Sequence, residues 1–139
     1  FTTALQEINL KHIEQMGSSA FSRCEKLKSV QLGTYLTKIN KETFKGCSSL
    51  SEINLGKIKK IGEKAFNGCS SLEKVDLESV ETLEQDAFKD CTSLNKVVLP
   101  NENAAKIKED IISQTGKSAG DGENKTIQFI NDPDVIKKQ

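Results

Sequence analysis

A nearly identical phrase recurs along this chain, as TFKGCSSLSEINL at 43–55, AFNGCSSLEKVDL at 65–77 and AFKDCTSLNKVVL at 87–99. A phenylalanine and a cysteine recur with it at intervals of 23, 22 and 22 residues, as Phe21, Phe44, Phe66, Phe88 and Cys24, Cys47, Cys69, Cys91. A period in this range is typical of solenoids, because one repeat cannot bury its apolar side chains alone and must stack on its neighbours. The recurring phrase therefore predicts a solenoid.

Two segments of each copy have the apolar pattern of extended chain. The first, L-x-x-[IV]-x-L, ends in alternating apolar residues and predicts one strand per copy, in a parallel sheet with strands about 4.8 Å apart. The second, x-[ILV]-x-x-[IML], predicts a short extended segment on the opposite wall, closed by a residue that tolerates positive φ at Gly17, Asn40 and Gly62. The A-F-x-x-C stretch that follows is expected to form one helical or 3₁₀ turn.

After Pro100 the repeat stops and the pattern changes. Apolar residues then lie at helical spacing, at Ala104, Ile107, Ile111 and Ile112. Asn101 or Asn103 is the expected N-cap of this helix and Gly116 its stop, and TIQFI at 126–130 predicts a short strand. Because a solenoid needs cover on its last turn, we interpret this segment as a cap.

The stretch LSEINLGKIKKIGEKAFNGCSSL (50–72) resembles the BspA-like, or treponemal-type, leucine-rich repeat family, whose consensus contains I-G-x-x-A-F-x-x-C-x-x-L. The likeness extends over residues 5–99, although Ile13, Ile58 and Val80 stand where the commoner leucine-rich repeat has Asn or Cys. The resemblance implies an α/β leucine-rich-repeat solenoid of about 22–23-residue repeats, with a parallel β-sheet on one face, short strands and helical or 3₁₀ turns on the other, and a C-terminal cap. The expected domains are a solenoid of four to five repeats at 1–99, and a capping helix, turn and short strand with a tail at 100–139.

The cysteine column allows three interpretations. A zinc site needs four converging ligands, whereas one cysteine per turn gives a straight file with steps of roughly 5 Å. Disulfides between neighbouring turns fit the usual Cα separation, but parallel neighbours point their Cβ atoms in one direction and strain the bond. We favour buried free thiols that act as small apolar side chains. Since His12 is the only histidine and recurs in no column, no thiol has a repeated base beside it.

The composition argues against several functions. Twenty basic residues balance twenty acidic ones, aromatic residues make up 5% of the chain and Trp is absent, so we expect no nucleic-acid partner. No apolar run is long enough to insert directly into a membrane. TGKS at 115–118 lacks the first glycine of a phosphate-binding loop, and DGEN at 121–124 lacks the spacing of a calcium loop. We therefore expect no cofactor, no metal, no catalytic residues and no enzyme activity.

The outward side chains of the predicted sheet form two columns that are the candidate protein-binding face. The first column is Glu7, Ser29, Glu52, Lys74 and Lys96, and the second is Asn9, Gln31, Asn54, Asp76 and Val98. This face is polar, with acidic residues toward its N-terminal half and basic residues toward its C-terminal half, and it has no Trp, Tyr or Arg anchor. Phe21, Phe44, Phe66, Phe88 and the four cysteines are expected to form a structural ladder on the opposite wall.

The family resemblance implies a protein-binding module of a cell-surface or secreted adhesin-like protein, with a host or extracellular-matrix protein as partner. The chain starts at Phe1 without an initiator Met, so we expect a piece of a longer protein whose targeting signal lies outside it. Two alternatives stay open. One is a structural spacer that holds another domain, and the other is a cytoplasmic interaction protein, which four free thiols would suit.

Overall fold

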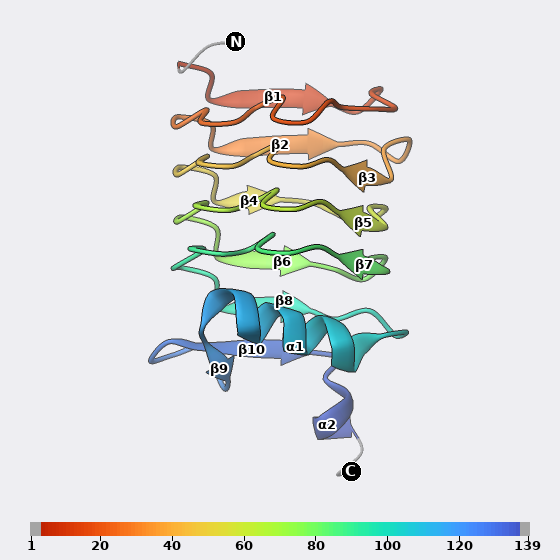
Figure 1. Ribbon diagram of the computed structural model, residues 1–139, viewed down its shortest axis with the longest axis vertical. Helices are drawn as coiled ribbons and strands as arrows, with labels where there is room; N and C mark the ends of the chain where they lie inside the picture. The colour runs from red at the N-terminus through yellow and green to blue at the C-terminus, as the bar shows by residue number, and fades with distance from the viewer. Residues whose placement is uncertain (1–3, 137–139) are drawn as a thin grey trace.

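The computed structural model describes residues 4–136, and each copy of the repeated phrase forms one turn of a solenoid (Figure 1). The L-x-x-[IV]-x-L segments form the strands β1 (Glu7–Leu10), β2 (Ser29–Leu32), β4 (Glu52–Ile53), β6 (Lys74–Asp76) and β8 (Lys96–Val98). These strands lie side by side along one wall and all run in the same direction (Figure 1). The parallel solenoid predicted from the repeat period is confirmed.

The strand register aligns equivalent residues of successive copies. Glu7 lies opposite Ser29, Ser29 opposite Glu52, and Lys74 opposite Lys96. Between β4 and β6, however, no strand ladder forms, so this wall divides into a β1-β2-β4 sheet and a β6-β8-β10-β9 sheet. Serine hydroxyls bridge the two ends of this gap: Ser71 Oγ donates to the Ser48 carbonyl, and Ser79 Oγ donates to the Gly56 carbonyl.

The second extended segment of each copy forms a separate sheet of two-residue strands. β3 (Lys38–Ile39), β5 (Lys60–Ile61) and β7 (Thr82–Leu83) pair in that order, in parallel. The expectation of positive φ at the closing residues is wrong, because Gly17, Asn40 and Gly62 all lie outside the left-handed region. The constraint at Gly62 is steric, since a Cβ there would lie 2.8 Å from the backbone carbon of Asn40 in the preceding turn.

The A-F-x-x-C stretches differ from the expected helical or 3₁₀ turn. In a helix every backbone N–H is donated locally, but here the donors alternate between the same turn and the next one. The Cys47 N–H donates to the Phe44 carbonyl in its own turn, whereas the Phe44 N–H donates to the Ala65 carbonyl in the next turn, at 2.9 Å. Left-handed residues such as Glu42 (φ 57°) produce this alternation. The result is a third backbone ladder along the outer wall.

The phenylalanine rings form a continuous stack inside this outer wall. Their centroids lie 5.7, 5.5 and 5.3 Å apart from Phe21 to Phe88, with interplanar angles of 10°, 14° and 4°. Phe44, Phe66 and Phe88 are fully buried, together with the leucine column at 27, 50, 72 and 94. The two inner rings, Phe44 and Phe66, therefore each contact the ring of the turn before and the ring of the turn after.

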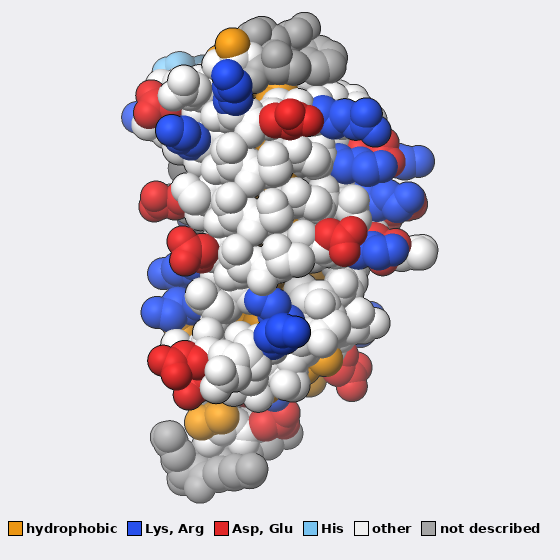
Figure 2. Space-filling model, turned by 90° about the vertical axis from the view of Figure 1, so that its left-hand side faces the viewer, with side chains coloured by type: hydrophobic (Ala, Val, Ile, Leu, Met, Phe, Trp, Pro, Cys, Tyr) orange, Lys and Arg blue, Asp and Glu red, His pale blue; other side chains and the backbone are white. Residues whose placement is uncertain are grey.

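Charged side chains lie outside this core and gather on particular faces. Figure 2 shows the edge of the solenoid at which the strands begin, and the acidic and basic side chains lie mainly along its two sides. The middle of this edge is largely uncharged. The loops that lead from the cysteines into β4 and β6 belong to the edge at which the strands begin, and they contain Ser48, Ser49, Ser70 and Ser71.

The C-terminal segment covers the last turn with a helix and a strand. It comprises α1 (Ala104–Thr115), β9 (Ser118–Ala119), β10 (Thr126–Ile130) and the short α2 (Pro133–Ile136). β10 pairs in parallel with β8, with Gln128 opposite Lys96, so it continues the long sheet as a further strand. Ile107 and Ile111 of α1 are buried against the core. Asn103 precedes the helix in a left-handed conformation without a side-chain cap, and Gly116 ends it at φ 72°.

Gln114 of α1 replaces the backbone of the turn that would come next. In the earlier copies the N–H of each core phenylalanine donates to a carbonyl of the following turn, at 2.8 to 2.9 Å. The Phe88 N–H instead donates to Gln114 Oε1, at 3.0 Å. Gln114 Nε2 in turn donates to the Glu84 carbonyl, at 2.9 Å. One amide side chain therefore satisfies the Phe88 donor that the end of the repeat leaves open, and it adds a second donor to the Glu84 carbonyl, which also accepts the Ala87 N–H at 3.4 Å.

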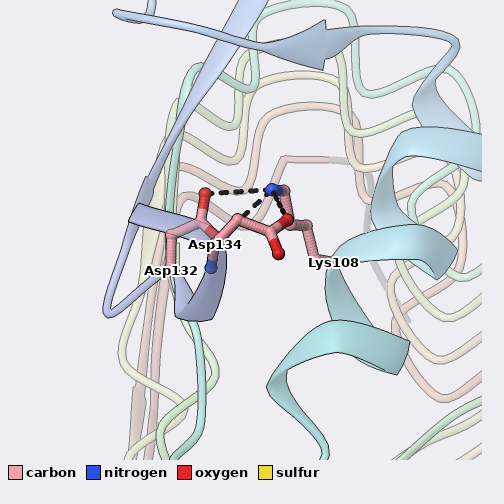
Figure 3. A network of polar contacts seen from close by, with 3 residues as sticks. All are labelled: Lys108, Asp132 and Asp134. Carbon is pink, nitrogen blue, oxygen red and sulfur yellow. Dashed lines mark hydrogen bonds and ion pairs between the residues drawn. The ribbon is translucent and has the colours of Figure 1, made fainter. Parts of the chain in front are cut away.

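A lysine joins α1 to the start of α2 (Figure 3). Lys108 Nζ lies 3.0 Å from Asp132 Oδ2 and 2.9 Å from Asp134 Oδ2, and it stands 5.8 Å from the centre of the Phe129 ring. Burial lowers the pKa of Lys108, but the hydrogen bonds to Asp134 and Asp132 together with their charges raise it above its ordinary value. Lys108 therefore stays charged and holds the segment after β10 against the cap helix.

Replacing Phe66 by alanine should reduce the free energy of unfolding by about 3–5 kcal/mol, the range for losing a buried aromatic side chain. Phe66 stacks on a ring on each side, whereas Phe21 is only half-buried, so Phe21→Ala should cost less. Denaturant unfolding of both variants measures the difference. Small and equal losses would show that the ring stack is not a main source of stability.

Replacing Gln114 by alanine should reduce the free energy of unfolding by about 1–3 kcal/mol, because the Phe88 N–H loses its partner and the Glu84 carbonyl loses one of its two donors. Ser113→Ala is the matched control, since Ser113 is the exposed neighbour on the same helix. Chemical denaturation of the two variants tests the role of the amide. Equal stabilities would mean that solvent replaces Gln114 without loss.

Candidate functional site

The long sheet presents the two predicted columns of outward side chains on one face. Strand register places Ser29 between Glu7 and Glu52 in the first column, and Asn9 beside Gln31 in the second. All ten predicted face residues are exposed or half-buried, while the residues between them, such as Val30 and Val75, point into the core. The regular spacing of this face follows from the pairing of the strands.

Three members of the second column also shape the ends of their strands. Asn9 Oδ1 accepts the Lys11 N–H at 3.0 Å, and Asn54 Oδ1 accepts the Gly56 N–H at 2.9 Å. Asp76 Oδ1 accepts the Glu78 N–H at 2.9 Å. These short polar side chains close the bend two residues after themselves, which is a common turn device. One oxygen of each is therefore committed to the fold, and the rest of the side chain remains available at the surface.

The sheet face is longer than the five repeated strands. Because β10 pairs with β8, Gln128 continues the first column next to Lys96, and Ile130 continues the second next to Val98. Ile130 is 38% exposed, which makes it an apolar member of an otherwise mainly polar face. The sequence did predict a strand at 126–130, but its partner strand and register were not predictable from local pattern.

Two adjoining grooves of about 470 and 450 Å³ run over the middle of the face. Both include Glu52, Ile53 and Asn54, and the larger one lies over the gap between β4 and β6, where Lys74 and Asp76 also line it. Charged, amide and hydroxyl groups form most of this lining, whereas small-molecule pockets are mainly apolar and enclosed. A polar groove across several strands suits contact with another polypeptide better than capture of a small molecule.

The cysteine thiols are part of the backbone network of the outer wall. Cys47 Sγ donates to the Phe21 carbonyl at 3.1 Å, Cys69 Sγ to the Phe44 carbonyl at 3.2 Å, and Cys91 Sγ to the Phe66 carbonyl at 3.1 Å. All four cysteines are buried and free. Each of these three thiols thus ties its own turn to the turn before it.

Burial also makes the thiols unreactive. It raises the pKa of Cys47 and of Cys91 to about 12, and it raises the pKa of Cys69 well above its ordinary value. A thiol with such a pKa is protonated at neutral pH, and the protonated form is neither a good nucleophile nor a metal ligand. The structure thus places the four thiols in the packed interior, where burial favours their protonated form.

The part of the chain that the structure describes contains no group of three or more His, Cys, Asp or Glu residues placed to hold a metal ion. Within that same part, no helix has the length and apolar character that crossing a membrane requires. His12 and Tyr35 lie away from the sheet face, in the bends that follow β1 and β2.

Comparison with known proteins identifies the family. Residues 1–117 match the family described as BspA type leucine rich repeat region, in six copies. The chain therefore belongs to the BspA-type leucine-rich repeat family, and the resemblance seen in its sequence is confirmed. A comparison with curated proteins found no match.

Solved structures of three bacterial leucine-rich repeat proteins are similar to this chain. A leucine rich repeat protein of T. pallidum (TpLRR) is 32% identical with a TM-score of 0.58, over 70% of this chain and 42% of its own. A leucine rich cell surface protein of Faecalibacterium prausnitzii A2-165 is 28% identical with a TM-score of 0.51, and the match covers 69% of this chain and 25% of that protein. A leucine-rich repeat protein of Bacteroides ovatus ATCC 8483 is 27% identical with a TM-score of 0.53, and the match covers 91% of this chain and 37% of that protein. The chain thus corresponds to less than half of each of these proteins.

The four thiols should react slowly with a thiol reagent in the native protein at pH 8 and rapidly in denaturant, without any reductant. The unfolded thiols ionise near their ordinary pKa of 9.0, but native Cys47 and Cys91 ionise only near 12. Their contribution to stability is therefore complete below pH 9 and is lost as the pH rises toward 12. A native mass that lacks the two hydrogens lost in forming a disulfide would contradict the free-thiol assignment.

Proposed function

We propose that this chain is a non-enzymatic protein–protein interaction module of a cell-surface or secreted protein, and that the sheet face makes the contact. The observation that carries the proposal is the pair of exposed columns on that face, which strand register holds at fixed steps within β1-β2-β4 and within β6-β8. Leucine-rich repeat modules generally act by binding and not by catalysis, and the raised pKa of the buried thiols agrees with such a role.

The comparison with the F. prausnitzii protein supports the proposed location. That protein is described as a leucine rich cell surface protein, and it shares both the repeat and the fold of this chain. We infer that this chain is also displayed at a cell surface or secreted. Its partner would then be a host or extracellular-matrix protein.

The charges of the face give the contact a direction. Acidic Glu7 and Glu52 lie on the N-terminal half of the first column, whereas basic Lys74 and Lys96 lie on the C-terminal half. A partner with the opposite order of charges would bind in one orientation, and its binding would weaken as salt screens these charges. Because the columns lack the aromatic and arginine anchors of tight interfaces, each contact should be weak and gain from multivalent display.

The absence of anchors from the two columns also favours a second function, a structural spacer that holds another domain away from the surface. A spacer needs the stacked core but no particular outward side chains. Changes on the sheet face that leave the fold intact would then have no effect on any partner.

Exchanging the charges at the groove, with Glu52→Lys and Lys74→Glu in one variant, should weaken binding to an extracellular-matrix protein about tenfold or more, as loss of interface contacts can do. The assay uses the chain clustered on beads against a panel that includes collagen and laminin, at low and physiological salt. The control variant carries Glu63→Lys and Lys89→Glu on the outer wall. Like the first variant, it has the same net charge as the unaltered chain, and it should bind the matrix protein as the unaltered chain does.

Loss of binding in the outer-wall variant, with retention in the sheet-face variant, would contradict the placement of the contact. If the clustered chain binds no member of the panel in a salt-dependent manner, the spacer becomes the better interpretation. Circular dichroism and thermal unfolding of both variants separate a lost contact from a lost fold.

A further inference from the structure

A second exposed surface follows the edge of the solenoid at which the strands of the long sheet end, on the right-hand side of Figure 1. The bends on this edge connect β1, β2 and β4 to the next segment of their turns. Six exposed residues of these bends, which we name the bend edge, are Lys11, His12, Thr34, Tyr35, Lys57 and Lys59. Tyr35 is the only tyrosine in the chain, and its side chain is 61% exposed.

Backbone contacts place these bends next to one another. Lys38 pairs with Lys60, and the Lys59 N–H donates to the Thr37 carbonyl at 2.7 Å. Extending this register backwards sets Tyr35 beside Lys57 in the next turn. On the other side, a Cβ at Gly33 would lie 1.9 Å from the Lys11 carbonyl oxygen, so only glycine allows the first bend to approach the second this closely.

The bend that carries Tyr35 is longer than its equivalents. It has three residues between Leu32 and Leu36, whereas the third copy has two between Leu55 and Ile58. The core positions at both ends are kept, since Leu36 and Ile58 are both buried. The additional residue therefore lengthens only the exposed part of the bend, where Tyr35 stands.

A small hollow lies between the bends of the second and third turns. Its volume is about 180 Å³, and its lining includes Gly33, Thr34, Gly56 and Lys57. The two glycines contribute no side chains to the hollow, and Lys57 supplies a positive charge at its border. A carboxylate side chain has a suitable size and charge for this position.

The charges along the edge change sign between the third and fourth turns. Lys11, Lys57 and Lys59 face solvent in the first three turns, with Glu14 as the acidic residue among them. In the fourth turn, Glu81 takes the place of Lys59, Ser79 takes the place of Lys57 and Glu78 takes the place of Gly56, and both glutamates are exposed. The basic stretch is therefore short and is followed directly by an acidic one.

We propose that the bend edge binds a short acidic segment of a protein partner, with Tyr35 packing against the segment and Lys11, Lys57 and Lys59 pairing with its carboxylates. Tyrosine is enriched at the centres of protein interfaces because it offers a large ring and a polar tip. A long uniform polyanion, such as a sulfated polysaccharide, fits less well, because its charges would extend onto Glu78 and Glu81. The surface adjoins the sheet face, because Lys11 also lines a groove of that face and Asn54 also lines the hollow, and it adds a second contact to the proposed interaction module.

The test is titration of a short Asp/Glu-rich peptide into the chain, followed by amide NMR shifts, with the Asn/Gln version of the peptide as the neutral control. The acidic peptide should shift amides at 33–37 and 56–59 and should bind more weakly as salt rises. Lys57→Glu combined with Lys59→Glu should weaken its binding at least tenfold, and Tyr35→Ala should weaken it severalfold. Tyr35→Phe, which keeps the ring, should retain most of the affinity.

Glu52→Lys with Lys74→Glu on the sheet face should leave binding of this peptide unchanged, which separates the two surfaces. Three outcomes would each overturn the inference: equal affinity for the neutral peptide, no binding of the acidic peptide, or amide shifts centred on Lys74 and Lys96. None of them would contradict the proposed sheet-face contact. Tighter binding of dextran sulfate than of the peptide at the same residues would also overturn it, in favour of a polyanion. Loss of matrix-protein binding in the sheet-face variant alone would leave the proposed function standing, whatever the peptide does.

Discussion

The stacking of one turn on the next is the interaction on which the rest of the structure depends. A single turn has no interior of its own, and its polar backbone groups point toward its neighbours. The phenylalanine rings stack at 5.3 to 5.7 Å, and the N–H groups of Phe21, Phe44 and Phe66 donate forward to the following turn. The cysteine thiols donate backward to the Phe carbonyl of the preceding turn. The two most regular columns of the sequence therefore hold each turn from both sides.

The same dependence explains the C-terminal segment. A last turn without a successor would expose Leu94 and Val97 and leave the Phe88 N–H unpaired. The protein meets these needs with different chemistry: α1 covers the apolar side chains, the Gln114 amide replaces a backbone carbonyl, and β10 adds a strand to the sheet. A segment without the repeat pattern thus supplies what a further repeat would have supplied.

Stacking also determines what the surface offers to a partner. Strand register makes neighbours of positions 22 or 23 residues apart within β1-β2-β4 and within β6-β8, and the stacking of the turns continues the columns across the gap between β4 and β6. The outward residues thus become columns with a defined order of charge. The sheet face carries acidic residues before basic ones, whereas the bend edge carries lysines before Glu78 and Glu81. A partner that spans both surfaces would meet opposite charge orders on the two, which favours one orientation of docking.

The sequence by itself determined the solenoid, its parallel strands and the residues of its core, because each of these features repeats and a repeated pattern has one stacked solution. It also predicted the two columns of the sheet face, since alternation within a strand sets which side chains point outward. Only the tertiary structure decided the alternating hydrogen bonds of the A-F-x-x-C turns, the missing ladder between β4 and β6, and the addition of Gln128 and Ile130 to the face. It alone also decided that Gln114 closes the last turn. These features depend on contacts between residues far apart in the chain, where local propensity does not specify the partner of a backbone group.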